Sequence, residues 1–205
     1  MPDIQEALEN CIVTTHASTP KPPYRGKVRD VYDLQDDILG IVVSDRISAF
    51  DHIMKQPIPF KGQILNRLSE FSFRKVNDIV STHILDVPHP NVTIAKKCEL
   101  IPIEVVVRGY LTGHAWRTYK SGKRELCGVP LPSGMREHEK FDHPILTPAT
   151  KAAEGHDEDI PEEEILSSGI VEPELWENIR ETAFRLFQRG TDVAARQGLI
   201  LVDTK

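Results

Sequence analysis

The sequence contains few cysteines, no long apolar run and no excess of positive charge. Its three cysteines, Cys11, Cys98 and Cys127, are odd in number and widely spaced, which favours reduced thiols in a cytoplasmic protein over a disulfide framework. No apolar run approaches the roughly 20 residues that a membrane span needs, and the acidic first ten residues do not resemble a secretory signal. The net charge of −6 argues against a nucleic-acid-binding protein, although local basic groups could still bind a small anion.

The first half of the chain is rich in predicted strands. At 205 residues and 40% apolar content, the chain can form one large domain or two small ones. The expected elements are a helix over 4–10, a hairpin of runs 25–34 and 38–44, a helix from Lys61 to Val76, and strands at 79–80 and 92–100. Short connections between such elements predict an antiparallel or mixed sheet in an α+β fold.

The second half is more irregular. The expected elements are a strand from Ile101, a helical turn over 115–120, a loop over 126–134, an irregular stretch over 135–160, helices starting near Pro161 and Pro173, and a final buried strand over 199–205. We expect Gly190 to weaken the last helix and Gly198 to end it. The acidic stretch 154–164 predicts a solvated surface.

The hairpin carries basic residues beside a glycine. If 25–34 is one strand, Lys27 and Arg29 share a face because side chains alternate. With Gly26 at the entrance, this pattern suggests a lid over a polyphosphate. An ordinary edge hairpin protected by lysines is the simpler alternative.

Two other segments could bind an anion. The apolar run from Ile101 leads to Arg108 and to a loop with Gly113, and a guanidinium beside glycine N–H groups suits phosphate or carboxylate. An ion pair with a structural acid explains Arg108 equally well. Lys61 and Gly62 stand near a helix N-terminus, which also attracts anions.

The last strand and the histidines raise the possibility of metal binding. Asp203 and Lys205 fall on one face of the strand, which is consistent with a metal–phosphate site or with a buried ion pair. His138, His143 and His156 have no regular ligand spacing, which argues against zinc. Polar ligand contacts or a helix cap are the preferred interpretation of His156 and Asp157.

Seven motifs occur in the order known from one enzyme family, and the chain from Tyr24 onward resembles the SAICAR synthetases (phosphoribosylaminoimidazole-succinocarboxamide synthases). The motifs are GKVRDVY from Gly26, SDRISAFD from Ser44, IPFKG from Ile58, IPIEVVVRGYLTG from Ile101, LTPATK from Leu146, HDE from His156 and LVDTK from Leu201.

The resemblance implies an ATP-dependent ligase that uses Mg²⁺. It would join L-aspartate to carboxyaminoimidazole ribotide through an acyl phosphate. Such chemistry needs positioning and cations rather than a covalent nucleophile, which agrees with the lack of a nucleophile elbow or triad. A kinase-like phosphotransferase for small molecules and an inactive nucleotide-binding fragment are the alternatives. No nucleic-acid or membrane partner is expected.

The resemblance also implies a two-lobed fold and residue roles. An N-terminal sheet lobe over 1–104 with a nucleotide-covering hairpin would face a second α+β lobe over 105–205, with ATP in the cleft between them. Lys27, Arg108 and Lys205 would be catalytic, and Asp203 would bind the metal. ATP would contact Gly26, Lys27, Val28, Arg29, Val31, Leu100 and Glu104. The substrates would contact Asp45, Arg46, Ser48, Asp51, Lys61, Arg108, Thr112, Gly113, His114, Thr147, Thr150, Lys151, His156 and Asp157.

Two departures from the family pattern matter. The family usually has serine where this chain has His114, and an imidazole is larger and can be charged. The chain also stops at Lys205, before the family's later acidic segment, which suggests a fragment. We therefore expect this polypeptide alone to bind ATP·Mg²⁺ poorly and to be inactive.

Overall fold

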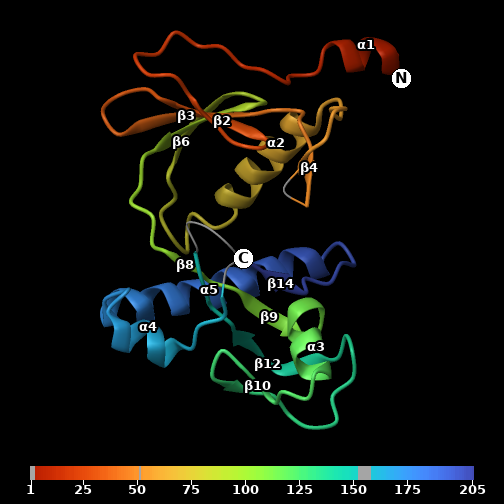
Figure 1. Cartoon of the computed structure of the whole chain (residues 1–205), viewed down its shortest axis with the longest axis vertical. Coiled ribbons are helices and arrows are strands. Elements are labelled where there is room, and N and C mark those ends of the chain that lie inside the picture. Colours follow the sequence, from red (N-terminus) through yellow and green to blue (C-terminus); the bar gives the residue numbers. More distant parts are fainter. Residues whose placement is uncertain (1–2, 51, 152–157) are drawn as a thin grey trace. The chain divides into compact units, whose positions relative to one another are not determined.

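A computed structural model describes residues 3–50, 52–151 and 158–205 of the chain. The chain divides into two compact units, Met1–Glu99 and Leu100–Lys205 (Figure 1). Helices and antiparallel strands occur in both units, which confirms the predicted α+β class. The functional boundary at residue 104 and an ATP cleft between lobes remain predictions.

The first unit is built on a five-stranded antiparallel sheet in the order β1-β2-β3-β7-β6. Its strands are β1 (Tyr24–Arg25), β2 (Arg29–Asp33), β3 (Ile38–Val43), β6 (Ile84–His89) and β7 (Val92–Lys96). The predicted hairpin is confirmed as β2 and β3, whose turn places Gln35, Asp36 and Asp37 at positive φ. Asp tolerates that conformation better than most residues do.

Three predictions of strand extent in the first unit were wrong, and in one of them the strand expected over 92–100 ends at Lys96. The run 25–34 is not one strand, because β1 ends at Arg25 and residues 26–28 turn back into β2. Lys27 and Arg29 therefore do not share a strand face. Residues 79–80 lie in turns and bends, whereas 84–89 form a strand that pairs with β7.

The helices of the first unit are α1 (Ile4–Glu9) and α2 (Lys61–Arg74), and a small hairpin joins β4 (Ser48–Ala49) to β5 (His52–Ile53). The helical prediction for α2 is confirmed, but its apolar side chains do not form the buried face. Those exposed side chains are Ile64, Leu65, Leu68 and Phe71.

Two small or polar residues of α2 are buried instead. Gly62 is buried where an added Cβ would lie 2.4 Å from the Val43 carbonyl oxygen, so no larger residue fits there. Asn66 Oδ1 accepts a hydrogen bond from Thr93 Oγ1 of the sheet at 2.8 Å. Close approach and a buried polar bond thus decide which face of α2 packs.

The second unit is organised around β9 (Val107–Tyr110), which lies between β12 (Lys140–Leu146) and β14 (Asp203–Thr204). Two smaller pairs join β8 (Ile103–Glu104) to β13 (Ala149–Thr150) and β10 (Glu125–Leu126) to β11 (Val129–Pro130). The helices are α3 (Gly113–Lys120), α4 (Glu162–Ser168) and α5 (Pro173–Ala195).

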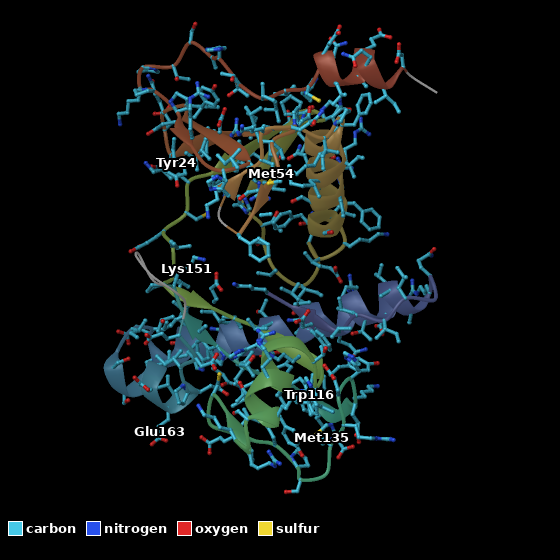
Figure 2. The ribbon with its side chains drawn as sticks, turned by 45° about the vertical axis from the view of Figure 1, so that its right-hand side comes forward. Tyr24, Met54, Trp116, Met135, Lys151 and Glu163 are labelled. Atoms are coloured by element: carbon cyan, nitrogen blue, oxygen red, sulfur yellow. The ribbon has the colours of Figure 1, made fainter. Side chains whose placement is uncertain are left out.

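Two hydrophobic clusters hold β9 and α3 in place. The first contains Val107, Leu146, Trp176 and Phe187, among other buried residues. The second gathers around Leu111 and Tyr119 (the other members are Ala115, Leu126, Cys127, Leu131 and Phe141), and Trp116 and Met135 pack against it (Figure 2). Burial of this kind contributes roughly 25 cal/mol per Å² of apolar surface, so the strand that carries Arg108 is rigidly positioned.

Several predictions for the second unit were wrong in detail. The run from Ile101 forms two strands, β8 and β9, in different sheets, and Arg108 lies within β9 rather than at the end of a strand. The supposed loop 126–134 contains β11, and the supposedly irregular stretch 135–160 contains β12 and β13.

The end of the chain also differs from expectation. Helix α5 continues through Gly190, where an added Cβ would lie 2.7 Å from Leu201 Cδ2. Close packing therefore explains the glycine. Only Asp203–Thr204 form a strand, and Leu199 and Ile200 are exposed. No helix within the described residues is long and apolar enough to span a membrane.

Candidate functional site

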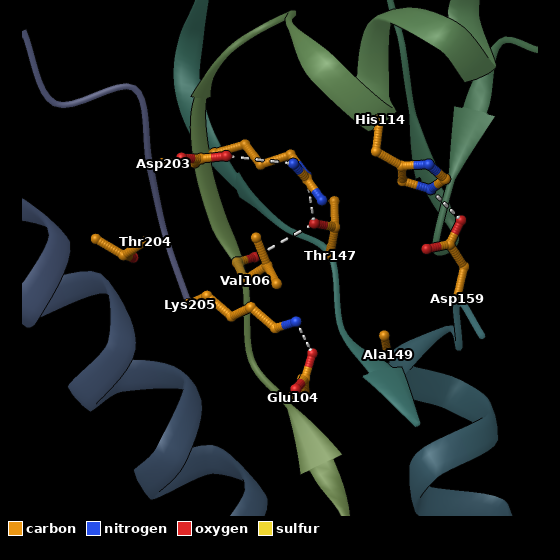
Figure 3. Close-up of a pocket in the computed structure, with 10 residues that line it drawn as sticks. Glu104, Val106, His114, Thr147, Ala149, Asp159, Asp203, Thr204 and Lys205 are labelled. Carbon is orange, nitrogen blue, oxygen red and sulfur yellow. Dashed lines mark hydrogen bonds and ion pairs between the residues drawn. The ribbon is translucent and has the colours of Figure 1, made fainter. Parts of the chain in front are cut away.

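A polar cavity of about 490 Å³ opens in the second unit (Figure 3). Six residues predicted as site residues line it, namely Glu104, Arg108, His114, Thr147, Asp203 and Lys205. Val106, Ala149, Asp159 and Thr204 complete the lining. The tertiary structure thus brings together side chains that are separated by up to about half of the sequence.

Arg108 lies at the centre of one wall. Antiparallel pairing of β9 with β14 sets Arg108 opposite Asp203, and its Nη1 lies 3.5 Å from Asp203 Oδ2. Its Nε donates to Thr147 Oγ1 at 2.8 Å, and Thr147 is itself 2% exposed. The Asp203 contact confirms that Arg108 has an acidic partner, and anion binding by Arg108 stays a prediction, since its side chain lines an open cavity.

Glu104 lines another part of the cavity and pairs with two lysines. Its carboxylate accepts a hydrogen bond from Lys151 Nζ and forms an ion pair with Lys205 Nζ. The Glu104 side chain is mostly buried, whereas both lysines are about half exposed. Lys205 lines the cavity, so its ammonium group can also contact an incoming phosphate or carboxylate.

His114 and Asp159 form a second pair among the residues that line the cavity. Their Nε2 and Oδ2 atoms are 2.7 Å apart, and both side chains are about 40% exposed. Asp159 was not predicted as a site residue, because it falls in the acidic stretch expected to be solvated. No local spacing could reveal the contact, since 45 residues separate the partners.

A buried thiol lies close to this pair. Cys127 Sγ donates to the Pro148 carbonyl oxygen at 3.3 Å. Burial is the main reason why the pKa of Cys127 rises to about 12, and the charge of Asp159 adds to the effect. The thiol is therefore neutral near pH 7 and does not serve as a nucleophile.

Carboxylates in the cavity could contribute to a divalent cation site. Asp203 and Glu104 supply oxygen ligands of the kind that Mg²⁺ prefers, and Mg²⁺ commonly takes only one or two carboxylates together with phosphate oxygens and water. Within residues 3–50, 52–151 and 158–205, no group of three or more His, Cys, Asp or Glu side chains could hold a metal. The two carboxylates therefore suit Mg²⁺ that arrives with a phosphate.

In the first unit, Arg46 holds the turn that carries Gly26 and Lys27. Its guanidinium donates to the carbonyl oxygens of Val13 (2.6 Å), Gly26 (3.1 Å) and Lys27 (3.2 Å). The turn is closed by a hydrogen bond of 2.8 Å from Gly26 N to the Arg29 carbonyl oxygen. Lys27 and Arg29 are exposed beside this fixed backbone.

The fully buried Asp30 anchors the same arrangement. Its carboxylate accepts from Arg46 Nη2 at 2.7 Å, Arg25 Nη1 at 2.9 Å and Thr15 Oγ1 at 2.6 Å. Burial acts to raise the pKa of Asp30, but these hydrogen bonds and the two guanidinium charges outweigh it, so the pKa lies below its usual value.

Asp45 occupies the helix terminus that seemed suited to an anion. Its Oδ1 accepts from Gly62 N and its Oδ2 from Ile12 N, both at 2.8 Å. Lys61 Nζ is buried, and it has no hydrogen-bond partner within the described residues. Burial lowers the pKa of Lys61, Asp45 opposes that effect, and Arg29 and Arg46 add to it.

The remaining predicted residues are dispersed. Ser48 lies in β4, Val28 and Val31 lie at the start of the first sheet, and Leu100 is exposed just before β8. Thr112 stands at the N-cap position of α3 without a side-chain capping hydrogen bond, and its Oγ1 lies 3.0 Å from His138 Nδ1. Gly113 starts α3 with φ of +55°, and Thr150 lies in β13. Asp51, His156 and Asp157 lie outside the described residues.

The sequence matches the family model described as SAICAR synthetase over residues 22–205. It is 53% identical over 186 residues to a phosphoribosylaminoimidazole-succinocarboxamide synthase of Bacteroides thetaiotaomicron, covering 90% of this chain and 59% of that protein. A synthase of the same name from Cytophaga hutchinsonii is also 53% identical, with 89% and 58% covered. The chain thus spans about 59% of the length of the curated relatives that it matches.

Solved structures agree with these relationships. A SAICAR synthase of Saccharomyces cerevisiae complexed with SAICAR superposes with a TM-score of 0.82 at 34% identity, covering 95% of this chain and 70% of that one. A type-2 SAICAR synthetase in complex with ADP has a TM-score of 0.72 at 27% identity, with 88% and 72% covered.

Proposed function

Because the chain belongs to the SAICAR synthetase family, we propose that it forms part of an ATP-dependent carbon–nitrogen ligase of purine biosynthesis. The ligase joins L-aspartate to carboxyaminoimidazole ribotide and releases SAICAR, ADP and phosphate. The observation that carries this proposal is the cavity that gathers Arg108, Glu104, Asp203 and Lys205. Three free cysteines are consistent with a cytoplasmic location.

The proposed reaction proceeds in two steps. A carboxylate is a poor electrophile, so ATP first phosphorylates the ribotide carboxylate. The aspartate amine then attacks the carbonyl carbon of the acyl phosphate, the bond from that carbon to the phosphate oxygen breaks, and the amine loses a proton. Both steps depend on positioning and on neutralising phosphate charge.

The cavity residues supply that positioning. Arg108 presents its guanidinium to the anionic group of the ribotide or of aspartate, and Thr147 and Asp203 hold the guanidinium in place. Lys205 and Lys151 lie on Glu104 and can exchange part of that contact for a phosphate. We assign Lys205 and Arg108 to catalysis on this basis.

In the first unit, Lys27 covers the ATP phosphates together with Gly26 and Arg29. Because Arg46 bonds to the carbonyl oxygens of Gly26 and Lys27, the turn is ordered before a ligand arrives, which lowers the entropy cost of binding. Side chains proposed for the adenine are Val28, Val31, Leu100 and Glu104.

The other proposed substrate contacts remain as the family resemblance implies. They are Asp45, Ser48, Asp51, Lys61, Thr112, Gly113, His114, Thr150, His156 and Asp157. Asp203, whose side chain is half exposed, would hold Mg²⁺, and Glu104 lies in the same cavity. When bound, Mg²⁺ neutralises the charge of the transferring phosphate.

A second candidate function is nucleotide or ribotide binding without turnover. The observation that favours it is that the chain spans about 59% of the length of its curated relatives. Under this alternative the chain binds an anion in the Arg108 cavity, but it forms no SAICAR even when it is extended to the length of its relatives.

A chimera separates the two candidates. The 205-residue chain, alone and extended by the unmatched C-terminal part of the Bacteroides thetaiotaomicron relative, is incubated with ATP, Mg²⁺, carboxyaminoimidazole ribotide and L-aspartate. We expect SAICAR from the chimera and none from the chain alone, and Arg108→Ala should abolish the product.

Phosphate release provides a second readout. A ligase releases phosphate only when aspartate is present, whereas a kinase-like enzyme would transfer phosphate from ATP without it. An inactive but folded chimera would reject the ligase proposal for this chain.

A further inference from the structure

We propose that an exposed apolar face of α2 binds helix α1 of a second copy of this chain, so that two copies exchange their α1 helices and form a dimer. The apolar face of α2 consists of five side chains that are 41% to 62% exposed, namely Phe60, Ile64, Leu65, Leu68 and Phe71. This dimer goes beyond the proposed ligase reaction and does not depend on it.

The apolar face of α2 is one continuous surface. Each of its members has another member three or four residues away, so the five side chains lie along one side of the helix. Gly62 and Asn66 lie on the opposite side and are buried against the sheet. The apolar face therefore points away from the core of its own unit.

Exposed apolar side chains are concentrated in this part of the sequence. Of the twenty large apolar side chains that are exposed among the described residues, nine lie between Phe50 and Phe71. Single exposed apolar residues are ordinary, but a cluster of them marks an interaction surface.

Basic residues predominate around the apolar face. Between Lys61 and Lys75 the sequence has four basic residues and one acidic residue, Glu70, although the whole chain has a net charge of −6. Glu70 already pairs with Arg74 at 2.6 Å, and Lys75 Nζ lies 5.3 Å from the centre of the Phe71 ring. Two such faces would repel each other, whereas an acidic amphipathic helix complements their charge.

Helix α1 has the complementary properties. With its N-cap residue Asp3 it carries Glu6 and Glu9 and no basic residue. Ile4 and Leu8 stand four residues apart on one side of the helix, and Ile4 is 75% exposed. None of the residues of α1 is buried. Because a helix of six residues is marginal in water without tertiary packing, an apolar surface would stabilise α1.

The two helices do not cover each other within one chain. Both belong to the first unit (Figure 1), yet α1 has no buried residue and the apolar face of α2 is exposed. Two hydrogen bonds to Asp45 fix Ile12, which follows α1, so the chain leaves α1 at a set point. Exchange between two copies covers both helices in both copies and gives a closed dimer with two-fold symmetry.

The exposed area is sufficient for a dimer. If a large apolar side chain has an area of roughly 150–250 Å², five side chains that are about half exposed present on the order of 500 Å² in each copy. Exchange uses this surface twice and adds the apolar side of both α1 helices, so the buried area reaches the roughly 1,200 Å² at which specific interfaces begin.

Sedimentation velocity over a range of concentrations measures the association of the 205-residue chain. We expect a reversible equilibrium between monomer and dimer. Leu68→Gln in α2 and Ile4→Gln in α1 should each raise the dissociation constant about tenfold or more, as for the loss of one buried aliphatic side chain. Both side chains are more than half exposed, so neither substitution should unfold the chain.

Leu175→Gln is the matched control. Leu175 is 45% exposed and lies in α5, outside both helices, so the dissociation constant should not change. Charge reversal tests the complementarity separately. Glu6→Lys and Arg67→Glu should each weaken the dimer, and their combination should restore part of the affinity.

Hydrogen exchange shows directly whether α1 is covered. The amides of residues 4–9 should exchange more slowly above the dissociation constant than below it. The same amides should exchange rapidly in Leu68→Gln at both concentrations, because that variant lacks the surface on which α1 packs.

A chain that is monomeric at every concentration would overturn the proposal. Slow exchange of α1 in that monomer would assign the apolar face to α1 of the same chain. Slower exchange of α2 in the chimera with the Bacteroides thetaiotaomicron segment would assign the face to that segment. A dimer that is equally strong in Ile4→Gln would also overturn the proposal, because α2 would then bind a surface other than α1. None of these results bears on the proposed ligase reaction.

Discussion

Arg108 and Asp203 are register partners on adjacent antiparallel strands, and their Nη1 and Oδ2 atoms lie 3.5 Å apart beside an open cavity. The guanidinium is only 13% exposed, whereas the carboxylate is half exposed. This asymmetry leaves the Asp203 carboxylate accessible from the cavity while Thr147 holds the more buried Arg108.

Replacing Arg108 with lysine should separate charge from geometry. Lysine keeps a positive charge but cannot fork onto a phosphate while it also bonds Thr147. We expect ribose 5-phosphate to bind about tenfold more weakly to Arg108→Lys, as for the loss of one charge-assisted hydrogen bond. NMR titration checks this, with Arg180→Lys on the exposed face of α5 as the control. Unchanged affinity would remove Arg108 from the anion site.

Asp30→Asn should destabilise the first unit, and the effect should depend on pH. Removing a buried charge that balances Arg46 and Arg25 costs about 3–5 kcal/mol at pH 7. The pKa of folded Asp30 lies below the unfolded value. Its stabilisation is therefore present above the unfolded pKa of about 3.9 and is lost as the pH falls through the folded pKa.

Urea unfolding of the unmodified chain and Asp30→Asn at pH 7 and at pH 3 measures that effect. The difference in unfolding free energy should be large at pH 7 and smaller at pH 3. Asp192→Asn, an exposed substitution in α5, should change little at either pH. A difference that does not vary with pH would show that the Asp30 charge contributes nothing.

Cys127 should resist alkylation under native conditions. With a pKa of about 12, roughly one thiol in ten thousand is ionised at pH 8, and the thiolate is the reactive form. Cys98 is exposed and should react first with iodoacetamide, as followed by peptide mass mapping. Denaturant should make both thiols react. Equal native rates would contradict the burial of Cys127.

Gly109→Ala should strain the core of the second unit. An added Cβ would lie 2.9 Å from Phe187 Cζ, and overpacking of this kind costs about 1–3 kcal/mol. Chemical denaturation should therefore show lower stability. Adding Phe187→Leu to Gly109→Ala should recover part of the loss, because leucine lacks the ring atom that the new Cβ would meet. If Gly109→Ala lowers the stability of the unmodified chain and of the Phe187→Leu variant by the same amount, the contact with Phe187 is not the cause.

Much of the fold could be predicted from local pattern. The hairpin of β2 and β3, the helices α2 and α5, and the strand β7 follow from β-branched runs, an aspartate-rich turn and helical periodicity. Short strands were missed because two-residue pairs such as β8 with β13 have no periodicity of their own. They form only when the partner segment is already in place.

The site was predictable only in part, for the same reason. Residue type and motif order identified Arg108, Glu104 and Lys205, but their pairing could not be read from the sequence. Helical periodicity predicted α2, but its apolar side chains are exposed, and the contacts at Gly62 and Asn66 bury another face of the helix. Helical periodicity shows on which face of a helix the apolar side chains lie, whereas tertiary packing decides whether that face is buried.

By itself the sequence determined the α+β class, the family and the chemical types in the cavity, because these depend on composition, local periodicity and motif order. Only the tertiary structure decided that Arg108 opposes Asp203 and that His114 meets Asp159. Such contacts join residues 45 or more positions apart, and strand register and backbone packing, not local preference, set distances over that range.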